Sequence, residues 1–118
     1  MRRNSSKIRE ADKKAARLMC ASFNESMRHG AEYKAALVKM IESQKQYIPE
    51  FRDVDAQSAM AASNLQVNVF LPHEIRRNVI QLIMYLITKH INPTLSGADL
   101  FLLDAVLDEK ILPAKEWV

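Results

Sequence analysis

Apolar residues recur at helical spacing through the first half of the chain. A serine pair at residues 5–6 can cap a helix, and the apolar positions within 8–27 follow the period of an α-helix. The pattern pauses at Gly30, resumes over 33–48 and is ended by Pro49. The sequence therefore predicts either two helices separated at Gly30 or one bent helix that tolerates this glycine.

The next two segments differ from each other in period. The Ala-rich stretch 53–64 has the spacing of a short helix. In 65–71 apolar and polar residues alternate, which is the pattern of a β-strand. A helix should then begin at Pro72, and its apolar positions cover so much of its surface that it is expected in a core. Ser96 with Asp99 resembles a capping box, which predicts a last helix to about residue 110.

Composition limits the candidate chemistry. The 118 residues include one cysteine, Cys20, and three histidines on separate segments, so no disulfide, metal site or cofactor is expected. A lone cysteine suits a reducing cytoplasm, and the longest apolar run is too short to span a membrane. No phosphate loop or nucleophile motif is present. We therefore expect a protein that is not an enzyme and that acts by binding.

Positive charge is concentrated at the amino end. Residues 1–30 carry eight basic and three acidic groups, whereas 31–60 and 61–118 each carry one more acidic than basic group. Such a basic segment can attract a polyanion, or it can be an ordinary solvated helix face. The basic residues that we expect to contact phosphates are Arg2, Arg3, Lys7, Lys13 and Lys14.

The single strand predicts a dimer. Its backbone donors and acceptors need a partner strand, and the chain offers no second convincing one. Two copies pairing their 65–71 segments about a twofold axis would bury the alternate side chains in a shared core. The residues expected in this dimer core are Val67, Val69, Val79, Ile83 and Leu86.

Two stretches carry a further likeness. They read Gln66-Val67-Asn68-Val69-Phe70-Leu71-Pro72-His73-Glu74-Ile75 and Leu95-Ser96-Gly97-Ala98-Asp99-Leu100. This order of strand, Leu-Pro, helix and Ser-initiated helix resembles the ribbon-helix-helix family of DNA-binding proteins, which includes Arc-type repressors. The resemblance covers residues 65–110. The sequence departs from the family pattern at Phe70, where Lys or Arg is usual.

The resemblance implies a DNA reader. In that family a two-stranded ribbon enters the major groove and reads bases with its outward side chains, which here would be Gln66, Asn68 and Phe70. The start of the second helix holds a phosphate in the family, which here would be Ser96 and Gly97.

The predicted fold is mainly α and dimeric: a helical amino-terminal region with a basic start (1–64), then a strand-helix-helix region for dimerisation and DNA binding (65–118). The predicted function is a non-enzymatic, homodimeric DNA-binding regulator or accessory protein in the cytoplasm. The alternative is a small helical adaptor or inhibitor that binds a second protein through the amphipathic helices of residues 7–48.

Overall fold

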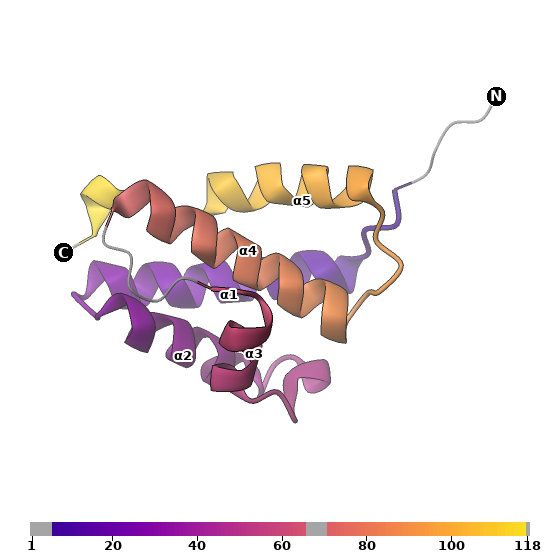
Figure 1. Cartoon of the computed structure of the whole chain (residues 1–118), viewed down its shortest axis with the longest axis horizontal. Coiled ribbons are helices and arrows are strands. Elements are labelled where there is room, and N and C mark those ends of the chain that lie inside the picture. Colours follow the sequence, from indigo (N-terminus) through magenta and orange to yellow (C-terminus); the bar gives the residue numbers. More distant parts are fainter. Residues whose placement is uncertain (1–5, 66–70, 118) are drawn as a thin grey trace.

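A computed structural model describes residues 6–65 and 71–117 of the chain. Within these ranges every regular element is helical (Figure 1). The five α-helices of the described residues are α1 (Glu10–Arg28), α2 (Tyr33–Gln44), α3 (Ala56–Ala62), α4 (Pro72–His90) and α5 (Gly97–Lys110). Two short 3₁₀ turns, η1 (Pro49–Phe51) and η2 (Ala114–Glu116), follow α2 and α5.

Local sequence signals set the helix boundaries. Gly30 has φ of 83°, a left-handed conformation that glycine adopts without steric cost, so the chain turns there and α1 and α2 are separate helices. The Asp55 carboxylate accepts a hydrogen bond from the Ser58 amide at 2.8 Å and caps α3. Pro72 occupies the first turn of α4, where its missing N–H costs no helical hydrogen bond.

The helices form a bundle in which α1 and α4 are central. α1 and α2 are an antiparallel pair, linked by the hydroxyls of Ser22 and Ser43 at 3.3 Å. α4 runs antiparallel to α1, and α5 lies along the outer edge of the bundle, parallel to α1 (Figure 1). α5 thus packs on α1 and α4 with one side only, and its other side is turned away from the bundle.

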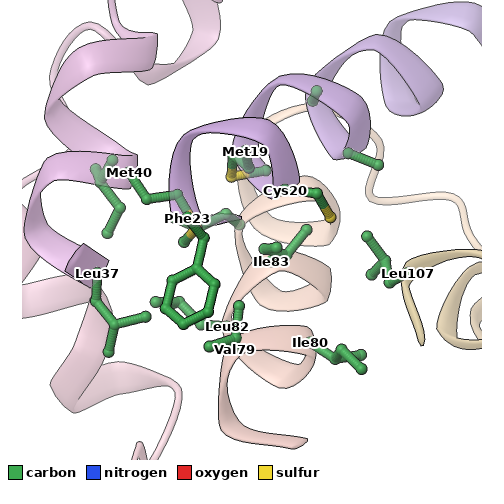
Figure 2. Close-up of a cluster of buried hydrophobic side chains, with 14 of the residues drawn as sticks. Met19, Cys20, Phe23, Leu37, Met40, Val79, Ile80, Leu82, Ile83 and Leu107 are labelled. Carbon is green, nitrogen blue, oxygen red and sulfur yellow. The ribbon is translucent and has the colours of Figure 1, made fainter. Parts of the chain in front are cut away.

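One hydrophobic cluster joins the helices. Figure 2 shows side chains of α1, α2, α4 and α5 meeting around Phe23 and Ile83. Both of these residues are fully buried. Other large side chains with almost no exposure include Met19, Leu37, Met40, Ile41, Phe51, Ile80, Leu82, Leu86, Ile87, Leu103 and Leu107. Trp117 meets the ring of Phe23 edge-on, with centroids 6.1 Å apart, and so covers one end of this core.

The predicted fold class is wrong. No strand occurs in residues 6–65 and 71–117, so the fold is a helical bundle rather than a ribbon-helix-helix unit. Most of the predicted strand, 66–70, lies outside the described residues. The apolar surface of α4 suggested a core shared between two chains, but α1, α3 and α5 of the same chain pack against it, and its apolar side chains are buried. The amino-terminal helices thus perform the packing that we had assigned to a second copy.

No helix within the described residues is both long and apolar enough to cross a membrane.

Candidate protein-binding surface

Helix α5 begins at a reciprocal cap. The Ser96 hydroxyl accepts a hydrogen bond from the Asp99 amide at 3.1 Å, and the Asp99 carboxylate accepts one from the Ser96 amide at 3.0 Å. The same carboxylate accepts from the Ser6 hydroxyl at 3.2 Å and the Lys7 amide at 3.3 Å. These hydrogen bonds, that of the Ser96 amide above all, lower the pKa of Asp99. The cap therefore fixes the start of α5 and ties it to the segment that leads into α1.

Arg76 of α4 holds the other end of α5. Its guanidinium donates to the carbonyl oxygens of Ile111 (2.6 Å), Leu112 (2.8 Å) and Asp108 (2.7 Å) and to the Asp108 carboxylate (2.9 Å). Carbonyls at a helix C-terminus have no partner within the helix, and a cation there also meets the negative end of the helix dipole. Asn24 of α1 adds a hydrogen bond to the last carbonyl of α5 at 2.8 Å and accepts one from the Leu112 amide at 3.0 Å.

The side of α5 that faces away from the bundle is apolar. Phe101 is 77% exposed, Leu102 52% and Val106 43%, and these are three of the five large hydrophobic side chains that are exposed among the described residues. Steps of three and four residues place them on one face, together with two exposed alanines. We call this face the outer stripe: Ala98, Phe101, Leu102, Ala105 and Val106. An exposed, contiguous apolar face of this kind is typical of a surface that binds a partner.

Cationic residues line α1 beside the outer stripe. Asn24 identifies the side of α1 that faces α5, because it bonds the end of α5. Arg17 and Lys13 precede Asn24 by seven and eleven residues, close to two and three helical turns, so they lie on the same side of α1. Both are exposed. We call Lys13 and Arg17 the basic edge.

The basic edge runs beside two residues of the outer stripe. α1 and α5 are parallel, and contacts of Lys7 with Asp99 and of Asn24 with the end of α5 fix their alignment. Residues 13 and 17 therefore fall between the two ends of α5. Leu102 and Val106 follow Asp99 by three and seven residues, which puts them on the side of the stripe nearest α1.

The opposite edge of the stripe is neutralised by ion pairs. Arg77 of α4 donates to the Asp104 carboxylate at 2.9 Å, and Arg76 pairs with Asp108. The hydrogen bond between Arg77 and Asp104 raises the pKa of the guanidinium and lowers the pKa of the carboxyl group. Among the described residues, Arg17 of the basic edge has no acidic partner, and Lys13 has only Glu10 at 3.5 Å. The unneutralised positive charge beside the stripe therefore lies on the α1 side.

Half of the residues predicted to bind DNA lie outside the described residues. These are Arg2, Arg3, Gln66, Asn68 and Phe70, together with Val67 and Val69 of the predicted dimer core. Their roles stay predictions. The remaining members of that predicted core, Val79, Ile83 and Leu86, are fully buried within a single chain.

The predicted phosphate site is a helix cap. Ser96 and Gly97 do lie at the start of α5, as expected. However, the Asp99 amide already donates to the Ser96 hydroxyl, and the Ser96 amide already donates to the Asp99 carboxylate. A phosphate there would meet this negative charge, so the geometry does not favour the predicted role. The basic residues Lys7, Lys13 and Lys14 are exposed.

Other polar features of the described residues include a shallow pocket and a buried cysteine. A shallow pocket of about 350 Å³ near α3 includes Asp53, Tyr85 and His90. Burial and the nearby charge of Lys89 lower the pKa of His90. In the described part of the chain, no three His, Cys, Asp or Glu side chains could together hold a metal ion. Cys20 is buried, and this burial raises the pKa of its thiol to about 12.

Comparisons with models of protein families, with characterised proteins and with solved structures give no match for this chain.

The outer stripe was not predicted from the sequence. The signal was present: positions 98, 101, 102, 105 and 106 form a second apolar helical face on the same segment.

Proposed function

We propose that this protein is a binding module that presents the outer stripe of α5 to an amphipathic α-helix of another protein. The observation that carries the proposal is the 77% exposure of Phe101 within an apolar face of α5. Helix recognition commonly uses apolar anchors spaced at i, i+3, i+4 and i+7, and the outer stripe offers residues at these spacings. α5 is held at its start by its capping box and by the segment that precedes α1, and at its end by side chains of α1 and α4, which supports its use as a rigid platform.

The proposal keeps the adaptor alternative of the sequence but changes the surface. The sequence predicts docking of a partner on residues 7–48. The apolar faces of α1 and α2 are occupied by the core, with Met19, Phe23 and Leu37 fully buried. A partner could reach those faces only by opening the bundle, whereas the outer stripe needs no rearrangement.

Binding energy should be concentrated at Phe101. Aromatic residues at the centre of a contact surface are frequent hot spots, and truncating one costs about 2 kcal/mol or more. A free-energy loss of about 1.4 kcal/mol is a tenfold loss of affinity. We therefore expect Phe101→Ser to lower the affinity for a partner helix at least about tenfold.

A displayed library of amphipathic helices with varied apolar and charged positions tests the proposal. The library is selected on the wild-type protein, and each recovered helix is synthesised and titrated against wild type, Phe101→Ser and Tyr47→Ser. Tyr47 is a matched control because it is also a half-exposed aromatic residue, 53% exposed, but lies beyond the end of α2. We expect binding that is lost in Phe101→Ser and kept in Tyr47→Ser, with circular dichroism showing that both variants fold.

Two results would contradict the proposal: no helix is recovered, or the recovered helices bind Phe101→Ser as well as wild type. DNA binding through Gln66 and Asn68 is a separate prediction, because these residues lie outside the described residues. A gel-shift titration of the wild-type chain tests it.

A further inference from the structure

We infer that the partner helix carries carboxylates along the flank that lies over α1, opposite Lys13 and Arg17. This inference rests on the proposed function, because it names the chemistry of the helix that the outer stripe would bind. It follows from the unequal charge of the two edges of the stripe.

A helix lying on the outer stripe has its own flanks over these two edges. On the α4 side, Arg77 is paired with Asp104 and Arg76 with Asp108. Charged side chains on the partner flank over α4 would therefore gain little electrostatic attraction. On the α1 side Arg17 is exposed and no described acidic side chain pairs with it. Carboxylates on that flank would meet the basic edge, whereas ammonium groups would be repelled.

The shape of the stripe also favours a single helix. Five residues over positions 98–106 extend about 12 Å along α5 at 1.5 Å per residue. A stable interface between two folded proteins usually involves about 20–30 residues on each side. The outer stripe is much smaller than this, and its length suits about two turns of a partner helix.

A second copy of the chain fits the charges less well. If two copies paired their α5 helices antiparallel about a twofold axis, the α1 side of one would face the α1 side of the other. The two basic edges would then repel. Parallel pairing would avoid this, but it would set the two helix dipoles side by side in the same direction.

Two synthetic helices test the inference. They share one apolar stripe and differ only on the flank intended for α1, which carries Glu in one peptide and Lys in the other. Fluorescence anisotropy is recorded at low ionic strength, where exposed charges interact over longer distances. We expect the Glu peptide to bind wild-type protein about tenfold more tightly, since several exposed attractive pairs are replaced by repulsive ones.

Charge-reversal variants locate the effect. In Arg17→Glu the preference for the Glu peptide should disappear or reverse. Lys34→Glu is the matched control: it changes the net charge by the same amount, but Lys34 is an exposed residue of α2, which packs on a different side of α1 from α5. The control should keep the wild-type preference, which would exclude an effect of overall charge alone.

The outcomes separate the two proposals. If both peptides bind equally and Phe101→Ser abolishes both interactions, the proposed function stands and the acidic flank is refuted. The same holds if Arg17→Glu leaves the preference unchanged. If neither peptide binds and the library also gives no binder, the proposed function fails. Concentration-dependent dimerisation in sedimentation experiments, lost in Phe101→Ser, would show that a second copy occupies the stripe and would overturn the inference.

Discussion

Replacing Arg76 should destabilise the protein far more than replacing its neighbour Arg77. Arg76 donates four hydrogen bonds at 2.6 to 2.9 Å, three of them to carbonyl oxygens at the end of α5. Its side chain is only 19% exposed, compared with 54% for Arg77. Arg77→Met removes one solvent-exposed ion pair with Asp104. Arg76→Met removes the contacts that hold the C-terminal end of α5 against α4.

The magnitudes separate the two variants. A hydrogen bond from a charged group contributes about 1.5–3 kcal/mol, and water can replace part of this at a partly exposed site, so we expect Arg76→Met to cost roughly 2–4 kcal/mol in total. An exposed ion pair is worth about 0–1 kcal/mol, which sets the expectation for Arg77→Met. Against a typical total of about 5–15 kcal/mol, the first loss is large and the second is small.

Urea unfolding of wild type and both variants measures these differences. Trp117 reports on the same region, because its ring packs on Phe23 and its segment follows the carbonyls that Arg76 binds. We expect a red-shifted native emission spectrum in Arg76→Met only. Arg76→Lys keeps the charge but not the forked geometry, so it should recover only part of the loss. Equal destabilisation by Arg76→Met and Arg77→Met would refute the reasoning.

Two further predictions concern titratable groups. The Ser96 amide and other donors stabilise the charged form of Asp99 and lower the pKa of its carboxyl group from the usual 3.8. The ionised carboxylate therefore stabilises the folded protein fully above pH 3.8, and this stabilisation is lost as the pH falls through the lowered pKa. The stability difference between wild type and Asp99→Asn, measured by urea midpoints, should therefore narrow below pH 3.8, and a constant difference down to about pH 2 would contradict this. Cys20 is 2% exposed and its pKa is raised to about 12, so iodoacetamide should modify it only when the protein unfolds. Alkylation of the native protein at the rate of a free thiol would show that this part of the core opens.

The helix boundaries were largely predictable because short-range chemistry determines them. Gly30 separates α1 from α2, Asp55 caps α3, and Pro72 begins α4. Ser96 and Asp99 form the expected capping box. Each signal acts within three or four residues, through a backbone conformation or a local hydrogen bond, and needs no knowledge of the tertiary structure.

The partners of each helix were not predictable from the same signals. The apolar pattern of α4 predicts burial but does not specify what covers the helix. The sequence analysis predicts a second chain there, whereas α1, α3 and α5 of the same chain cover α4. Long-range contacts such as those of Arg76 with the end of α5 leave no local pattern in the sequence. The alternation in 65–71 predicts a strand, but so few alternating residues are too short a signal to distinguish a strand from a connecting segment.

The outer stripe was missed because α5 is apolar on two sides. In a helix with one apolar face, the sequence shows directly which side is buried. In α5, Leu103 and Leu107 are buried and Phe101 and Leu102 are not, although all four are apolar. Only the positions of α1 and α4 decide which side is free.

The fold does not need the outer stripe to be apolar. α5 is fixed from the inside by Leu103 and Leu107 and at its ends by the capping box and by Arg76. Phe101, at 77% exposure, removes little of its surface from water on folding, so its hydrophobic contribution to stability is small, at about 25 cal/mol for each Å² buried. Polar residues in the stripe would preserve the same internal contacts. The apolar side chains of the stripe therefore contribute hydrophobic free energy mainly when another surface covers them. For this reason we assign binding to this face rather than to the buried faces of α1 and α2.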